Sequence, residues 1–274
     1  MLASVRHRLG SADVLLLATV VVWSFHFPVI KYAVSNGFAP LVYATLRFGI
    51  GSLLFAGITY GREGSLRVVG RRDLVLLAGV AGVAIYVNQM AFITSVKLTT
   101  AATVALLFGT LPVFVGLIAW RLRLERPGAR HWTAAAISFT GVALVAAEAE
   151  GGLSGDLGGI LIGLVAPLTW ALYSVLAGPL MRRYSPYRIS AVVGLAAIGP
   201  LAASAAPQFA SEDWGAIPAL GWLALLYSML LAFVITNVFW FRAIERAGAN
   251  RAALYANLLV GGERSSAGAI TIGP

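Results

Sequence analysis

The sequence predicts an all-α polytopic membrane protein, an inverted repeat of two five-helix units in which the second unit is truncated after a short ninth helix. Three observations predict this fold: long apolar segments, arginines confined to alternate connections, and a similarity between the two halves of the chain. Apolar residues make up 59% of the 274 residues and charged residues 11%, whereas soluble domains carry about 25% charged residues. A soluble fold is therefore excluded. The chain has no cysteine, which excludes disulfides and thiolate metal sites.

Eight segments have the length and composition of transmembrane helices, and the mean hydropathy of the chain, +0.85, agrees with them. A span needs about 20 mostly apolar residues to cross roughly 30 Å of hydrocarbon. Lipid offers no partner for backbone N–H and C=O groups, so each of these segments is expected to be helical. The expected spans are residues 13–33, 40–60, 73–94, 99–120, 131–148, 158–178, 187–206 and 217–241.

Residues that favour helix starts lie at several of these boundaries. Asp13 and Asp73 are candidate N-caps of the first and third spans. The second, seventh and eighth spans begin at Pro40, near Pro186 and near Pro218. A proline is tolerated there because the first turn of a helix leaves its N–H groups unbonded in any case.

Glycines spaced four residues apart predict close helix packing inside two spans. One pair is Gly57 with Gly61, and the other is Gly159 with Gly163. Small residues at this spacing let two helix backbones approach closely in a membrane. We therefore expect both pairs to serve packing rather than ligand binding.

The distribution of arginines orients the chain. One alternating set of connections holds sixteen of the twenty Lys and Arg residues, while the other set holds Lys31, Lys97 and several acids. The positive-inside rule places the arginine-rich set in the cytoplasm. This predicts a multi-pass protein of the cell (inner) membrane with a cytoplasmic N-terminus. The sixteen residues are Arg6, Arg8, Arg62, Arg67, Arg71, Arg72, Arg121, Arg123, Arg126, Arg130, Arg182, Arg183, Arg188, Arg242, Arg246 and Arg251.

The two halves of the chain resemble each other. Trp23 in the first span lies 147 residues before Trp170 in the sixth, and Gln89 in the third lies 148 residues before Asn237 in the eighth. Each unit holds five helices, an odd number, so the second unit enters the membrane from the opposite side. Inverted repeats are common in secondary transporters, whose substrate sites lie near the midplane where the halves meet.

Short motifs mark successive spans. In chain order they are Trp23-Ser24 with Pro28, Leu46-Arg47-Phe48, Leu111-Pro112-Val113-Phe114 with Glu125-Arg126, Trp170-Ala171 and Arg251-Ala252-Ala253. On these motifs the sequence resembles the drug/metabolite transporter superfamily, specifically the EamA-type permeases, from about residue 12 to residue 260. The resemblance implies ten helices in two halves. It also implies a secondary transporter, a permease or exporter of small polar metabolites such as amino acids.

The pattern breaks near the C-terminus. By the repeat, Val260 takes the place of Pro112, yet Glu263 comes three residues later rather than thirteen. The apolar part of the ninth helix would be about 16 Å long, which is half a membrane, and a tenth helix is missing. The expected units are therefore residues 1–148, the first repeat; residues 158–260, the second and incomplete repeat; and residues 261–274, an atypical tail.

This ending leaves three interpretations open. The chain is a truncated or disrupted family member without transport activity, a half-complete subunit that needs a partner, or a protein whose tail folds back as a re-entrant segment. In each case, the transport interpretation refers to the complete ten-helix architecture that the resemblance implies.

Two ionisable side chains are candidate substrate-binding residues. Arg47 lies about 10 Å inside the second span by helix rise, and an ionisable group at such depth indicates function. Its guanidinium would engage a substrate carboxylate; the alternative is that it snorkels outward or binds backbone carbonyls. His26 precedes Pro28 by two residues, in a locally loosened helix, and would bind substrate or carry a proton; the alternative is a packing role.

Neutral polar and aromatic residues complete the candidate site. The repeat places Asn88 and Gln89 in the helix equivalent to that of Asn237, where amides either bind polar solutes or join helices. Trp23 and Trp170 lie near the midplane of their spans, away from the interfaces where tryptophan is enriched. They are candidate cavity walls, as is Tyr173 by the same reasoning, with ordinary packing as the alternative.

Other classes of function are not indicated. HExxH, P-loop and GxSxG motifs and paired intramembrane carboxylates are missing, and Ser24 and His26 would lie about 200° apart on a helix. We therefore expect no enzyme, no cofactor and no bound metal. The expected partners are a small-molecule substrate and the lipid bilayer, with a homo-oligomer as an open alternative and no nucleic acid.

Overall fold

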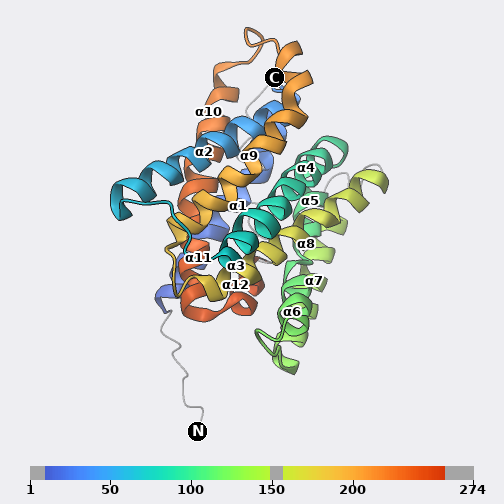
Figure 1. The fold of residues 1–274 in the computed structure, drawn as a ribbon. Helices are drawn as coiled ribbons and strands as arrows, with labels where there is room; N and C mark the ends of the chain where they lie inside the picture. The colour runs from blue at the N-terminus through green and yellow to red at the C-terminus, as the bar shows by residue number, and fades with distance from the viewer. Residues whose placement is uncertain (1–9, 149–156, 257–274) are drawn as a thin grey trace.

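The computed structural model describes residues 10–148 and 157–256, and this part of the chain is a bundle of helices (Figure 1). Two segments, η1 and η2, are π-helical and continue into the α-helices beside them. The elements are α1 (Ser11–Ser35), α2 (Pro40–Glu63), α3 (Arg71–Leu74), η1 (Val75–Ala81), α4 (Gly82–Leu98), α5 (Ala101–Phe108), α6 (Leu111–Arg121), α7 (Ala129–Glu148), α8 (Leu157–Leu180), α9 (Pro186–Ser211), α10 (Ala219–Met229), η2 (Leu230–Ile235), α11 (Thr236–Ala247) and α12 (Ala249–Ala256).

Seven helical segments of the described chain are long and apolar enough to cross a membrane, so the protein is a multi-pass membrane protein. They coincide with seven of the eight expected spans. The remaining expected span, residues 131–148, coincides with α7, which is not among the seven apolar segments. Its first turn contains Arg130 and His131, and these polar residues lower its hydropathy. The seven segments are Ser11–Ser35, Pro40–Glu63, Arg71–Leu98, Ala102–Arg121, Leu157–Leu180, Pro186–Ser211 and Ala219–Ala247.

The helix starts follow the proline signals more closely than the acidic ones. Pro40 and Pro186 are the first residues of α2 and α9, and Pro218 directly precedes α10. The prediction that Asp13 and Asp73 are N-caps is wrong. Both lie inside the first turn, where Asp13 accepts the Gly10 N–H at 3.0 Å. A carboxylate in a first turn is still favourable, because it lies near the positive end of the helix dipole.

The described part of the predicted ninth helix is α12. Glu125, which follows α6, accepts the Ala249 N–H at 3.0 Å and the Asn250 side-chain amide, so it satisfies donors at the start of α12. The remainder of the expected second repeat, residues 257–260, and the expected tail, residues 261–274, lie outside the described residues.

The two halves of the chain pack along each other through three pairs of spans. The span of α2 packs along α9, α4 along α8, and α1 along α10 and α11 (Figure 1). In the predicted repeat, each span of the first half has an equivalent in the second half. The second span packs along its own equivalent, the third along the equivalent of the first, and the first along the equivalent of the third. This is the pairing that a two-fold relation between the halves requires. The inverted repeat itself stays a prediction.

Glycine makes the closest of these contacts. A Cβ atom at Gly159 would lie 2.7 Å from the Cβ atom of Leu98, and one at Gly163 would overlap Ser95 and Leu107. The predicted packing role is thus confirmed for this pair. It is wrong for Gly57 and Gly61, because a Cβ atom at either would meet no described atom within 4 Å.

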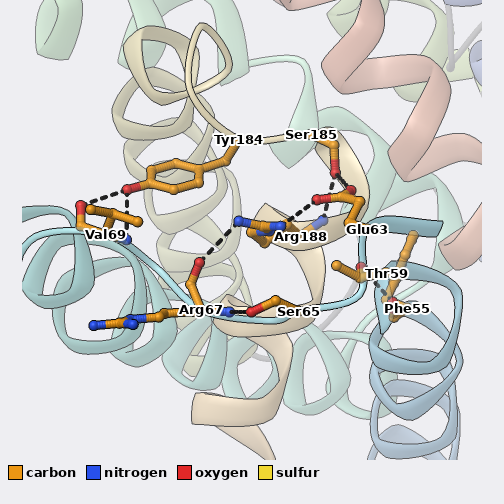
Figure 2. A network of polar contacts seen from close by, with 9 residues as sticks. All are labelled: Phe55, Thr59, Glu63, Ser65, Arg67, Val69, Tyr184, Ser185 and Arg188. Atoms are coloured by element: carbon orange, nitrogen blue, oxygen red, sulfur yellow. Dashed lines mark hydrogen bonds and ion pairs between the residues drawn. The ribbon is translucent and has the colours of Figure 1, made fainter. Parts of the chain in front are cut away.

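Polar contacts join the halves at one end of the bundle, which we call the arginine-rich end and which contains connections 64–70 and 181–185. Figure 2 shows Tyr184, Ser185 and Arg188 facing the chain that follows α2. Arg188 pairs with Glu63 at 2.8 Å and donates to the Arg67 carbonyl at 3.0 Å. Tyr184 accepts the Val69 N–H at 3.1 Å.

The phenol of Tyr184 also donates to the carboxylate of Asp73 at 2.9 Å. Burial, together with this carboxylate, raises the pKa of Tyr184 above its usual value. The phenol therefore keeps its proton at neutral pH and remains a donor in this network.

The opposite end of the bundle is also joined across the halves. Glu212, beyond α9, accepts the Ala39 N–H at 3.1 Å, and Gln208 accepts the Leu41 N–H at 2.9 Å. These side chains satisfy backbone donors that the start of α2 leaves unbonded. Residues of the second half thereby hold the start of a helix of the first half.

The close approach of α8 to α4 predicts different effects for two glycine substitutions. We expect Gly163→Val to lower the melting temperature of the purified protein in detergent, because overpacking of this kind costs about 1–3 kcal/mol. Gly57→Val places the same side chain in open space, so the melting temperature is expected to stay unchanged. Equal melting temperatures for the two variants would contradict the packing described for α8.

Candidate functional site

A cavity of about 70 Å³ lies between the two halves of the bundle. Its walls come from α1, α2, α4 and α5 of the first half and from α8 and η2 of the second. An engineered cavity of roughly 150 Å³ admits benzene, so this cavity is smaller than one that holds an aromatic ring. The lining residues are Trp23, His26, Phe27, Arg47, Phe48, Asn88, Gln89, Phe92, Phe108, Trp170, Ala232 and Phe233.

The side chain of Arg47 is buried in this cavity, with 5% of its surface exposed. Its Nη1 lies 2.7 Å from Nε2 of His26, and its Nη2 donates to Oε1 of Gln89. Its Cζ atom lies 5.8 Å from the centroid of the Phe92 ring. The guanidinium therefore neither snorkels outward nor binds a backbone carbonyl, which were the alternatives to a cavity role.

The amides of α4 extend the contacts of Arg47 to the second half. Gln89 donates from Nε2 to Oδ1 of Asn88 at 2.8 Å, and Asn88 donates from Nδ2 to the Ala166 carbonyl in α8 at 2.7 Å. A continuous hydrogen-bonded chain thus runs from α2 through α4 to α8. It fixes which faces of α4 and α2 meet the cavity.

The contact with Arg47 determines the tautomer of His26. A guanidinium has only donors, so Nε2 of His26 must accept and the ring proton lies on Nδ1. This Nδ1 atom is buried and has no hydrogen-bond partner among the described residues. The histidine therefore presents an unused N–H donor.

Tryptophans from both halves meet at the cavity. The rings of Trp23 and Trp170 lie 5.8 Å apart, edge to face, and the ring of Trp240 lies 5.4 Å from that of Trp23. The indole N–H of Trp23 donates to Oγ1 of Thr236 at 2.9 Å and to the carbonyl of Ala232 at 3.1 Å. The α1 span is thereby tied to the π-helical turn of the eighth span, and π-helical turns are frequent at functional sites.

The structure brings together six of the eight residues that the sequence singles out: Trp23, His26, Arg47, Asn88, Gln89 and Trp170 line this one cavity. Tyr173 and Asn237 do not line it. The ring of Tyr173 lies behind the wall, 5.6 Å from that of Trp170, and Asn237 is buried within α11. A role in substrate binding stays a prediction for all eight residues.

Sequence reasoning missed the apolar part of the wall, which consists of Phe27, Phe48, Phe92, Phe108, Ala232 and Phe233. An apolar side chain in an apolar span carries no mark that separates a cavity wall from a lipid-facing or packing position. A signal was available for Phe27, Phe48 and Phe92, which lie within two turns of Trp23, Arg47 and Gln89 in the sequence, but not for Phe108, Ala232 and Phe233. In the part of the chain that the structure describes, no cluster of His, Asp and Glu suits a metal ion.

Comparisons with known proteins agree on a transporter. The model of the EamA-like transporter family matches residues 10–147 and 157–260. The chain is 24% identical to the "Uncharacterized transporter YyaM" of Bacillus subtilis (strain 168), over 90% of this chain and 81% of that protein. It is 26% identical to the "Uncharacterized transporter YdeK" of the same organism, over 84% of this chain and 78% of that protein.

The fold has a counterpart among solved structures. A structure described as "Crystal structure of protein" superposes with a TM-score of 0.71, covering 96% of this chain and 90% of that one at 20% sequence identity. At this identity the likeness concerns the arrangement of helices alone.

Proposed function

The chain belongs to the EamA-like transporter family, and from this premise we propose that it is a secondary transporter that moves small polar metabolites, such as amino acids, through the cavity between its halves. Members of this family are transporters rather than enzymes. The observation that carries the proposal is the convergence of charged, amide and indole side chains from four spans on one cavity in the bundle interior. Polar groups in such a place are costly in a membrane and are typical of substrate pathways.

The two closed ends of the bundle support a mechanism by alternating access. The arginine-rich end is joined by Arg188 with Glu63, and the opposite end by Glu212 with the start of α2. Both sets of contacts run between the halves of the chain. A solute reaches the cavity when one set separates and leaves when the other does, by rocking of one half against the other.

The orientation of the chain is the second part of the proposal. We infer that the arginine-rich end faces the cytoplasm of a cell whose inner membrane holds the protein, since exposed arginines such as Arg71, Arg121 and Arg182 gather there. The N-terminus of α1 lies at the arginine-rich end too, because Arg251 pairs with Asp13 at 2.7 Å.

The absence of native cysteine makes the orientation testable by labelling. Ala216 is exposed at the end opposite the arginine-rich end, and Gly128 is exposed in the connection between α6 and α7, so each is replaced by cysteine in turn. We expect a membrane-impermeant maleimide to label Ala216→Cys in intact cells and Gly128→Cys only after the membrane is opened. The reverse pattern would contradict the proposed orientation.

The transport route predicts which substitutions stop flux. The full-length chain is reconstituted in vesicles loaded with amino acids, organic acids and sugars, and efflux is followed by mass spectrometry. We expect Trp23→Ala and Arg47→Ala to reduce efflux to the rate of loaded vesicles that contain no protein, because both side chains line the cavity.

Matched controls separate this effect from a general loss of folding. Trp120 is 62% exposed on α6, and Arg121 is exposed beside it, so Trp120→Ala and Arg121→Ala are expected to keep efflux near the wild-type rate. All four variants are compared at equal amounts of inserted protein. Efflux that is unaffected by Trp23→Ala and Arg47→Ala would refute the route, and a chain that moves none of the solutes would refute transport.

A further inference from the structure

We propose that the cavity selects organic monoanions, that is, solutes with a carboxylate on an apolar or aromatic body, over the corresponding zwitterions, cations and alcohols. This inference rests on the proposed function and narrows it, because it names organic acids, in place of the amino acids given there as an example, as the solutes of the same cavity. It is carried by the charge of Arg47, by the balance of free donors and acceptors around it, and by the chemistry of the wall.

Among the described residues, the positive charge of Arg47 has no acidic partner. The ion pairs among the described residues are Arg183 with Asp73, Arg188 with Glu63 and Arg251 with Asp13, and all three lie at the arginine-rich end. Every residue that lines the cavity apart from Arg47 and His26 is uncharged at any pH. The neutral His26 and Gln89 solvate the guanidinium without cancelling its charge. A buried, uncompensated charge is costly, so an anion in the cavity is favoured over a neutral solute.

The hydrogen-bonding groups that remain free in the cavity are donors. Three buried N–H groups lack a partner among the described residues: Nε of Arg47, Nδ1 of His26 and Nε1 of Trp170. The side-chain oxygens are already engaged, since Gln89 accepts from Arg47 and Asn88 accepts from Gln89. A carboxylate offers acceptors only and forms strong charge-assisted bonds with a guanidinium. An ammonium group would find no carboxylate among the lining residues, and the two amide oxygens there each already accept one hydrogen bond.

The rest of the wall matches an apolar body. Phenylalanines of α1, α2, α4 and α5 and the indole rings of Trp23 and Trp170 surround the polar groups. Such a wall interacts well with a hydrocarbon or aromatic group, whereas the polyhydroxylated body of a sugar would lose hydrogen bonds to water without replacement. The cavity of about 70 Å³ has room for the carboxylate itself. The body of the solute requires the aromatic walls to separate.

The test uses four compounds with one body and four head groups: 3-phenylpropanoate, phenylalanine, 2-phenylethylamine and 3-phenylpropan-1-ol. Binding to the purified full-length chain in detergent is measured from the rise in melting temperature with compound concentration. We expect 3-phenylpropanoate to bind at least about tenfold more tightly than the other three, since the amine and the alcohol lack the charge-assisted bonds of a carboxylate with a guanidinium, and the ammonium group of phenylalanine lacks a partner of opposite charge.

Two variants place the selectivity on Arg47. Arg47→Gln removes the charge, and Gln89→Glu cancels it in place with a side chain of almost the same shape. Both are expected to lose the preference for 3-phenylpropanoate, while Arg121→Gln, which removes an exposed arginine, keeps it. Because Gln89→Glu forms a new ion pair with Arg47, it is expected to fold even if Arg47→Gln does not.

The outcomes separate this inference from the proposed function. Equal affinities for the four compounds, tighter binding of phenylalanine or the amine, no binding of 3-phenylpropanoate, or a preference that survives Gln89→Glu would each overturn the anion selectivity. None of these results bears on the proposed route of transport through the cavity. That route is tested by the rate of efflux from vesicles that contain the Trp23→Ala variant.

Discussion

The arrangement of the bundle interior depends on keeping one cation, Arg47, inside a membrane. Hydrocarbon does not solvate a guanidinium, so its donors must find acceptors on neighbouring helices. Its Nη1 and Nη2 atoms find them on α1 and α4, through His26 and Gln89, and Gln89 is itself held by Asn88, which binds the backbone of α8. Four spans are thus placed relative to one another by one charge. None of these contacts neutralises it, and the site therefore retains a positive field at the centre of the protein.

The two halves contribute differently to this centre. In the predicted repeat, the position that corresponds to Arg47 is Gly194 in α9. A Cβ atom there would overlap Ser52 of α2, so the backbone of α9 approaches α2 closely one turn away from the arginine. The first half contributes the charged side chain of Arg47. The second half contributes a glycine, whose lack of a side chain lets α2 and α9 approach closely. The cavity is therefore asymmetric, even though the spans pair between halves as a two-fold relation requires.

Sequence patterns predicted the spans well because hydrocarbon imposes one requirement on every residue of a helix, and apolar length reports on it directly. The same logic identified Arg47, His26, Asn88 and Gln89, since a polar side chain in an apolar span is conspicuous. It failed for Phe92 and Phe233, which differ in nothing visible from lipid-facing phenylalanines. Nor did it predict that Asn237 lies outside the lining of the cavity. The π-helical segment η2 ends two residues before Asn237 and changes the helical period, so the face of α11 that meets the cavity cannot be deduced from a period of 3.6.

The contacts that close the two ends differ from those at the centre in how readily they separate. Arg188 and Glu63 remain partly accessible to water, as do the groups around Glu212, so water replaces each bond that opens and the net cost is small. The bonds of Arg47, Gln89 and Asn88 are buried, and no solvent replaces them. In the mechanism proposed above, movement of one half against the other would therefore begin at the ends rather than at the centre. Of these buried bonds, only the one from Asn88 to the Ala166 carbonyl joins the two halves, so it is at α8 that the bonded centre resists their separation.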